Sequence, residues 1–459
     1  MPTPSLLIVP SRWKTGNPGK LYSQIPTNGN GDFNVTGVVT GGTSIGTRVN
    51  NLGYIERITT SGTPRLDYYT SSGTPGCPAL LVEPAGTNIC LQSENFLTTW
   101  SPTNVTVTTG LTEAFTAPDG TTNADLITAT SNSPSFIAQD ITIASGTYTI
   151  SVFAKAGNYG LFRLGNVSSL ARAAWFNLNA GAVTGTVNGG TASMQNYGNG
   201  WYRCIYTSTG VVSGTPTVFF APSDAPNSTN AVSGSSIYFW GAQVETGSVA
   251  TSYIPTTTGS VTRAAEVISV SGAVSGSIGQ TEGTIYAEVD IRNLTTADFA
   301  RIVTLRETAN ANNFFEIEKR SSTQLRISAR LNSGTTITFL THPNAFQLGT
   351  NKIAFAYQDG NYAMGFNGVV ATSSQAGMTA SLNQVILGAS TANAAHLNDR
   401  IRAAALYNTR LSNADLMLLT MPGNNTYLPQ AVWNNYLSRT GNTELPDCLY
   451  TRHADLLDV

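Results

Sequence analysis

The sequence has little charge and very little cysteine. Asp, Glu, Lys and Arg make up 11% of its 459 residues, whereas they make up about a quarter of an average globular protein. Hydrophobic residues still account for 41%, which argues against a disordered chain, because such chains carry more charge or less apolar surface. The four cysteines lie far apart and include no Cys-x-x-Cys pair, so we expect buried free thiols and no disulfide framework.

Basic runs and long apolar runs are also missing. The formal net charge is -2 and no stretch is basic, which gives no electrostatic basis for nucleic-acid binding. The N-terminal apolar run extends only from Leu6 to Val9, too short for a signal peptide or a membrane span, and no later segment reaches spanning length. We therefore expect synthesis in a cytoplasm and no membrane insertion.

Turn-forming and β-forming residues are plentiful instead. The chain has 44 glycines and abundant Thr, Ser and Asn, which is typical of β-proteins with many tight turns. Its length predicts two or three domains. We predict an all-β fold class, with two β-sandwich (jelly-roll) domains in series after an N-terminal attachment segment.

The first predicted sandwich covers residues 76–266, where strands and turns follow one another without a helical pattern. In one strand, alternation places four side chains on one face: Tyr148, Ile150, Val152 and Ala154. In the last strand, alternation predicts one face with Ile237, Phe239 and Gly241, and an opposite face with Tyr238, Trp240 and Ala242. Trp175 and Trp240 are predicted to be core residues.

The second predicted sandwich covers residues 283–422 and follows a linker at 267–282. Apolar alternation on both sides of Asp359 and Gly360 predicts a hairpin with its turn at these two residues. The segment LSNADLMLLTM predicts one short helix, with Ser412 or Asn413 as its N-cap.

The two ends of the chain are less regular. Residues 1–75 contain short apolar pieces that could form strands but hardly a core of their own. We expect this segment to serve attachment or oligomerisation. Residues 423–459 change character and receive no assignment.

Several motifs occur in one order between residues 47 and 266. They read TRVNNLGYIERI, GTPRLDY, CPALLVEPAGTNICLQSENF, PDGTTNAD, YTISVFAKAG, GNGWYRC, YFWGAQVETG and TSYIPTTTGSVTRAA. This series resembles a module of bacteriophage tail-fibre and head-fibre proteins, in which a carbohydrate-binding-type β-sandwich follows the segment equivalent to PALLVEPAGTN. The segment from GTIYAEVDI to NDRIRAAALYNTRLSNADLMLL is similar to concanavalin A-like jelly rolls of the laminin-G type. The start of the chain resembles virion proteins of crAss-like gut phages.

These resemblances imply a structural protein of a phage virion, as a fibre or appendage subunit. They imply a homotrimer that contacts other virion proteins, binds host-surface or mucin glycans, and has no enzymatic activity. Two alternatives stay open. One is a purely architectural role, as capsid decoration or spacer. The other is a polysaccharide depolymerase, although the chain lacks the solenoid repeat on which such spikes usually rely.

Two adjacent aromatic residues, Trp201 and Tyr202 in GNGWYRC, are the candidate ligand-binding residues. The C–H face of a sugar packs on an aromatic ring, so either residue could stack on a glycan. The alternative is the start of a core strand, with Gly198 and Gly200 forming the turn before it.

Three oxygen-bearing residues in PDGTTNAD, namely Asp119, Asn123 and Asp125, are candidate ligands of a structural calcium ion. Their spacing does not match an EF-hand loop, and a turn closed by Asx hydrogen bonds explains them as well. No other cofactor is expected.

Paired carboxylates occur in FFEIEKR, where Glu316 and Glu318 lie on one face of a strand. Such a pair could serve glycoside hydrolysis. The alternative is cross-strand pairing with Arg326 or Arg330.

Overall fold

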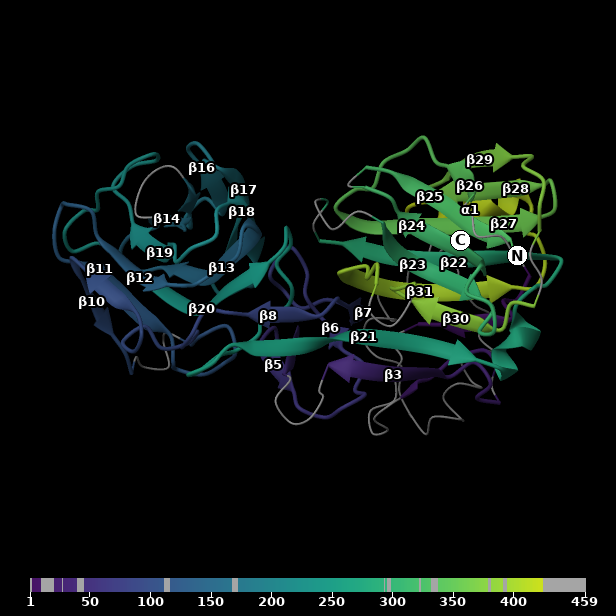
Figure 1. Ribbon diagram of the computed structural model, residues 1–459, viewed down its shortest axis with the longest axis horizontal. Helices are drawn as coiled ribbons and strands as arrows, with labels where there is room; N and C mark the ends of the chain where they lie inside the picture. The colour runs from purple at the N-terminus through teal and green to yellow at the C-terminus, as the bar shows by residue number, and fades with distance from the viewer. Residues whose placement is uncertain are drawn as a thin grey trace, which may run out of the picture.

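The computed structural model describes residues 2–9, 20–26, 28–38, 45–110, 116–166, 172–292, 294, 299–321, 323–331, 337–378, 381–390 and 394–423. Within these residues the protein is all-β, as predicted, and consists of two β-sandwiches side by side (Figure 1). The C-terminal tail lies outside the described residues from 424 onward. No helix in the described part of the chain has the length and hydropathy needed to cross a bilayer.

The N-terminal sandwich consists of two antiparallel six-stranded sheets. The first has the order β10 (Val105–Thr108), β11 (Asp125–Ala129), β20 (Ser236–Thr246), β13 (Gly146–Ala156), β18 (Trp201–Val211) and β17 (Gly190–Asn196). The second has the order β16 (Ala182–Thr184), β15 (Ala173–Asn177), β14 (Leu161–Gly165), β19 (Thr217–Pro222), β12 (Phe136–Asp140) and β9 (Ser101–Thr103).

The core between these sheets follows the period-two pattern of the strands. The face predicted for β13 is buried in it: Tyr148, Ile150, Val152 and Ala154. Trp175 and Trp240 are buried as expected, at 0% and 1% exposure, but each packs in a smaller cluster on the opposite face of its sheet. Cys90 and Cys204 are buried free thiols. The burial of alternate residues therefore accounts for most of this sandwich.

A β-bulge changes the predicted faces of β20. Ile237 and Phe239 share the face that meets the core between the sheets and Trp240 lies on the opposite face, which fits the predicted alternation, but Ala242 lies on the face of Ile237 and Phe239 and not on that of Trp240. The pairing of β13 with β20 shifts register here, and Gly241 has a φ of 63°. A bulge inserts one unpaired residue, so the alternation reverses after it. A Cβ on Gly241 would lie 2.9 Å from the ring of Phe153, which favours glycine at this position.

The C-terminal sandwich consists of two larger sheets. The first has the order β29 (Val369–Ser373), β28 (Tyr362–Phe366), β27 (Gly349–Gln358), β22 (Glu282–Ile291), β31 (Asp399–Tyr407), β7 (Ala79–Val82) and β6 (Leu66–Asp67), with β1 (Leu6–Ile8) also paired to β31. The second has the order β2 (Lys20–Leu21), β3 (Phe33–Val38), β21 (Val261–Ser271), β30 (Gln384–Leu387), β23 (Ala300–Arg306), β24 (Asn313–Lys319), β25 (Leu325–Leu331) and β26 (Ile337–Thr341), with β8 (Gly86–Asn88) also paired to β21.

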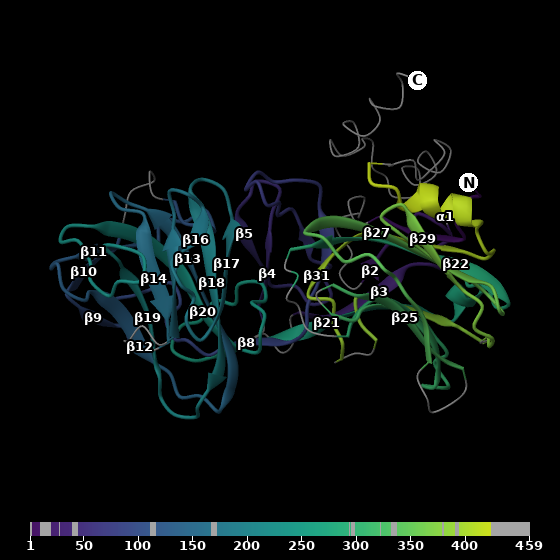
Figure 2. The ribbon, with the colours of Figure 1, turned by 90° about the horizontal axis from the view of Figure 1, so that it is seen from above.

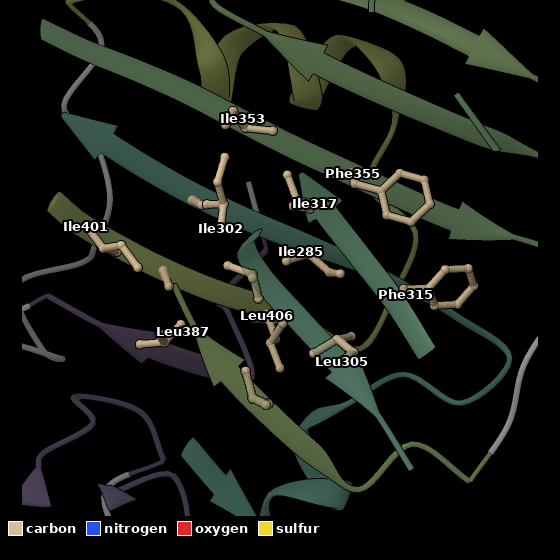
Figure 3. Close-up of a cluster of buried hydrophobic side chains, with 14 of the residues drawn as sticks. Ile285, Ile302, Leu305, Phe315, Ile317, Ile353, Phe355, Leu387, Ile401 and Leu406 are labelled. Carbon is tan, nitrogen blue, oxygen red and sulfur yellow. The ribbon is translucent and has the colours of Figure 1, made fainter. Parts of the chain in front are cut away.

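Aliphatic and aromatic side chains from both sheets fill this second core (Figure 3). β27 and β28 form the predicted hairpin, with the turn at Asp359 and Gly360. Helix α1 (Asn413–Thr420) covers β27 and β28, and Ser412 caps it by accepting a hydrogen bond from the backbone N–H of Asp415 at 3.1 Å. The predicted helix and its cap are therefore confirmed.

The N-terminal segment is not separate from the second sandwich. β1 pairs with β31, where Leu6 lies opposite Leu406, and β3 pairs with β21. β6 and β7 extend the sheet that contains β31. The described residues 6–8, 20–21 and 33–38 are therefore part of this sandwich, because Leu6, Ile8, Leu21, Phe33 and Val35 are buried in a core supplied mainly by residues 268–406.

The predicted linker at 267–282 likewise contains regular structure. Its first residues belong to β21, which pairs with β8, β3 and β30, and a 3-10 helix, η4 (Ala273–Ser277), follows. β21 passes from the junction between the sandwiches into the C-terminal one (Figure 1). β4 (Gly46–Val49) pairs with β5 (Ile55–Ile58), and Figure 2 shows both between the two sandwiches.

A buried arginine–carboxylate network lies at the junction. Its members are Arg65, Asp67, Glu83, Arg263, Glu266, Asp290, Arg292, Asp399, Arg400 and Arg402. At its centre, Arg65 donates to Glu83 at 2.7 Å and to Glu266, and the side chain of Arg65 has 0% exposure. Arg292 reaches Asp399 at 3.2 Å. Because buried charges are tolerated only when paired, the network fixes how the segments at the junction meet.

Candidate functional site

Strand alternation separates the two predicted sugar-stacking residues. Trp201 is 2% exposed and packs with Phe153, Trp240 and Tyr253 on the outer face of the β13 sheet. Its indole N–H donates to the backbone oxygen of Thr116 at 2.9 Å. A ring in this position offers no face to a ligand. Trp201 is therefore a core residue at the start of a strand, which was the alternative to a sugar-stacking role.

Tyr202 is half-buried and lines an open pocket of about 390 Å³. Residues 52–53, 72–75 and 196–200 form the rest of this Tyr202 pocket. The volume lies within the range of small-molecule sites. The pocket therefore contains one of the two predicted ligand-binding residues, together with loops from two distant parts of the sequence that were not predicted.

Close backbone contact between two glycine turns builds the pocket wall. Gly73 has a φ of 79°, and a Cβ at this position would lie 2.6 Å from the backbone nitrogen of Gly198. The amide of Asn196 fastens the two turns together, because its Nδ2 donates to the backbone oxygen of Ser72 at 3.0 Å and its Oδ1 accepts from the N–H of Gly198 at 2.9 Å. Only glycine permits this approach, so the wall is fixed before any ligand binds.

Ring contacts of Tyr197 also hold the turn at 196–200 in place. The Tyr197 ring contacts the ring of Phe153 edge-on at a centroid distance of 4.9 Å and the ring of Tyr69 at 5.1 Å. Burial raises the pKa of Tyr197 above its usual value, so its hydroxyl stays protonated in the physiological range. The turn at 196–200 is thus held by an aromatic side chain as well as by hydrogen bonds.

The described lining residues of the Tyr202 pocket carry no ionisable carboxylate, imidazole, amine or guanidinium group. They offer amides from Asn196 and Asn199, hydroxyls from Ser72 and Thr74, and the phenol of Tyr202. The exposed Asn199 has a φ of 51°, at the tip of the β17–β18 hairpin. Such a set can donate and accept hydrogen bonds to a neutral polar ligand. It supplies no general acid or base of the kind that glycoside hydrolysis uses.

The predicted calcium ligands have protein partners in the structure. Asp119 accepts hydrogen bonds from the backbone N–H and the hydroxyl of Thr121, at 3.0 and 2.7 Å. Asn123 accepts from the indole N–H of Trp240 at 2.9 Å, and Asp125 accepts from the N–H of Phe96 at 2.8 Å. Among the described residues, no cluster of three or more His, Cys, Asp or Glu side chains could hold a metal ion. Asp119 therefore makes the expected Asx bond, whereas Asn123 and Asp125 bond to distant residues, and calcium binding there stays a prediction.

Asp125 has a testable electrostatic property. Burial outweighs the hydrogen bond from Phe96 and raises the pKa of Asp125 from 3.8 to about 6. The buried charge therefore costs stability above pH 6, and this cost vanishes below about pH 4, where both folded and unfolded states are protonated. We expect Asp125→Asn to raise the free energy of unfolding by on the order of 2 kcal/mol at pH 8, and to change it little at pH 4.

Urea unfolding at the two pH values measures this effect. Asp119→Asn, in the same turn, serves as the control and is expected to show no pH-dependent gain. A larger loss of stability in Asp125→Asn at pH 8 than at pH 4 would contradict the prediction, because it would mean that the ionised carboxylate stabilises the fold.

The fold and the pocket define an all-β protein of two joined sandwiches with a neutral polar pocket. No protein-family model and no curated protein sequence matches the chain. A carbohydrate-binding CBM40 module of a Ruminococcus gnavus sialidase, bound to α2,3 sialyllactose, has a similar structure, with 17% identity, 32% of this chain and 87% of that chain covered, and a TM-score of 0.28. Domain 4 of a Geobacillus stearothermophilus arabinanase, in complex with arabinotriose, has 14% identity, coverage of 38% and 82%, and a TM-score of 0.27.

A heptameric pentraxin from Limulus polyphemus is a third similar structure, at 13% identity, with 32% of this chain and 72% of that chain covered and a TM-score of 0.25. At TM-scores this low, the similarities concern part of the fold and identify no ligand for this chain.

Proposed function

We propose that this protein is a structural subunit of a phage fibre or appendage that binds neutral glycans in the Tyr202 pocket. The observation that carries the binding function is the pocket itself. It combines amides, hydroxyls and a half-buried tyrosine without a charged side chain. A neutral saccharide presents many hydroxyl groups and an apolar C–H face, which such a lining matches.

The rigid construction of the pocket also favours binding. Gly73 and Gly198 are in close contact, and the turn at 196–200 is held by hydrogen bonds of Asn196 and by ring contacts of Tyr197. A preformed site loses little conformational entropy when a ligand binds. A hydroxyl-rich ligand that makes only weak contacts therefore binds more tightly to this site than to a flexible site with the same contacts.

The junction between the sandwiches favours a structural role. The motifs that resemble phage fibre proteins supply the pocket and much of the arginine–carboxylate network. GTPRLDY contributes Arg65, CPALLVEP contributes Glu83, and GNGWYRC contributes the pocket turn. A junction held by buried ion pairs and by the strand β21 suits a protein that projects a binding module from a particle.

The proposal includes four further points: the protein belongs to a virion, forms a homotrimer, contacts other virion proteins, and binds host-surface or mucin glycans. Immunogold labelling of intact phage particles tests the location, and native mass spectrometry of the protein tests the trimer. Gold on projecting appendages supports the proposal. Unlabelled particles would remove the virion role, and glycan binding would then belong to a soluble lectin.

Two substitutions test the pocket. Asn199→Gly removes an exposed amide and keeps a residue that tolerates the left-handed backbone. Tyr202→Ala removes the aromatic surface. On an array of neutral mucin-type oligosaccharides and in calorimetric titrations of the bound ones, we expect each variant to bind about tenfold more weakly or worse. Asn199→Gly should leave the melting temperature unchanged.

Asn104→Gly is the matched control, because Asn104 is also exposed, has a φ of 52° and lies outside the pocket lining. It should bind as the wild type does. A silent array with folded wild-type protein would favour the purely architectural role. Release of reducing ends from a polysaccharide would favour a depolymerase.

A further inference from the structure

A second pocket lies on the outer face of the C-terminal sandwich. Its volume is about 310 Å³, and it lies over β23, β24 and β25. We call it the arginine cleft and define it by Arg301, Arg306, Phe314, Glu316 and Arg330. It lies in a different sandwich from the Tyr202 pocket and has the opposite character, because most of its named side chains are charged.

Strand register brings these side chains together. Arg306 lies opposite Phe314, and Phe314 lies opposite Arg330, so the three form one row across the sheet. Their neighbours in the sequence, such as Leu305 and Phe315, point into the core on the other side (Figure 3). Side chains one residue apart in a strand face opposite ways. The side chains of the cleft therefore lie together on the outer face of the sheet.

The carboxylates at the cleft are already neutralised. Arg301 reaches Glu316 at 2.5 Å and Glu318 at 2.8 Å, and Arg326 also pairs with Glu318. Of the two readings of the Glu316–Glu318 pair from the sequence, the structure therefore supports cross-strand pairing with Arg326. Glu318 pairs with two guanidinium groups and Glu316 with one. Neither carboxylate is therefore an isolated group of the kind that could act as a general acid or base.

Two further guanidinium groups leave the cleft with an excess of positive charge. Arg330 donates to the amide oxygen of Asn312 at 3.0 Å and lies 5.7 Å from the ring centroid of Phe314. Arg306 is half-buried, and its Nε donates to the backbone oxygen of Glu307 at 3.4 Å. The lining holds three arginines and one glutamate. Its preferred occupant is therefore an anion.

We propose that the arginine cleft binds a carboxylate-bearing saccharide. A guanidinium group is planar and matches a carboxylate with two parallel hydrogen bonds. Phe314 is half-buried between Arg306 and Arg330 and offers an apolar surface beside the charge. The hydroxyls of Thr304 and Ser390 also line the cleft. A bare inorganic anion would use the arginines alone, whereas an acidic sugar would use all three kinds of group.

Matched pairs of sugars test the proposal by calorimetric titration of the full-length protein. The acidic members are glucuronate, galacturonate and N-acetylneuraminate, and the neutral members are glucose, galactose and N-acetylmannosamine. We expect at least one acidic sugar to bind about tenfold more tightly than its neutral counterpart. The affinity should also fall as sodium chloride is added.

The variant Arg306→Gln with Arg330→Gln should weaken binding of that sugar by about tenfold or more. Arg306→Gln alone is the second variant, should the double variant fold poorly. Arg320→Gln is the control, because Arg320 stacks on Phe299 and does not line the cleft. Asn199→Gly should keep the acidic-sugar affinity, which separates this site from the Tyr202 pocket.

Three results would overturn the proposal. The first is equal affinity for acidic and neutral sugars, or no binding of any acidic sugar. The second is unchanged affinity in both arginine variants. The third is sulfate or phosphate binding as tightly as the best acidic sugar, which would make the cleft an inorganic-anion site.

Discussion

Arg65→Met is expected to lower the free energy of unfolding by about 3–5 kcal/mol. Arg65 is fully buried and donates to Glu83, Glu266, the backbone oxygen of Thr47 and the hydroxyl of Ser252. Methionine fills a similar volume but leaves two buried carboxylates short of a partner. Removing one member of a buried pair is costly because the remaining charge is uncompensated.

Urea unfolding of wild type and variant measures this loss. Arg57→Met is the control, because Arg57 pairs with Glu94 at 2.7 Å but has 46% side-chain exposure. An exposed pair of this kind contributes about 0–1 kcal/mol. An equal loss in the two variants would contradict the account of the junction.

The same substitution has a predicted pH dependence. Burial alone would raise the pKa of Glu83, but Arg65 and Arg263 outweigh it and hold the pKa below its usual value of 4.5. A lowered folded-state pKa contributes stability above the unfolded pKa, and this contribution is lost as pH falls through the folded one. The difference between wild type and Arg65→Met should therefore shrink between pH 7 and pH 3.

Trp201→Ala is expected to cost about 3–5 kcal/mol of stability, the typical result for a buried tryptophan. The substitution would empty the space beside Phe153 and Trp240 and remove the hydrogen bond to the backbone oxygen of Thr116. Trp201→Phe should cost less, because most of the space stays filled. Thermal and urea unfolding of both variants measure these losses.

The substitutions at Trp201 and in the pocket are expected to affect different properties. Trp201→Ala should unfold more easily, whereas Asn199→Gly, two residues away, should lose binding alone. If Trp201→Ala kept wild-type stability and lost glycan binding, Trp201 would be a sugar platform, and its assignment to the core would be wrong.

Strand patterns could be predicted from the sequence because alternation is a local property. The buried face of β13, the hairpin at Asp359 and Gly360, and the Ser412 cap all follow from residues within a few positions of one another. The reversal after Gly241 could not be predicted from alternation, since a bulge depends on how the neighbouring strand pairs.

The long-range features could not be predicted in this way. Leu6 pairs with Leu406, a contact across almost the whole chain. Arg65, Glu83 and Glu266 look like surface residues in sequence, because charge normally indicates solvent exposure, and only their convergence shows that they are buried together.

Only part of the Tyr202 pocket could be predicted from the sequence. GNGWYRC identifies Tyr202, and period-two alternation implies that Trp201 and Tyr202 face opposite ways, so at most one of them could serve a surface site. Ser72 and Thr74 carry no such signal, because their loop reaches the pocket only through the close contact of Gly73 with Gly198.

A crystal structure with the neutral oligosaccharide that binds most strongly on the array tests the central claim most directly. The account predicts a sugar ring in the Tyr202 pocket, with hydroxyl groups bonded to Asn199 and to the hydroxyls of the 72–75 loop. A neutral sugar bound at another surface, with the Tyr202 pocket empty, would contradict the account.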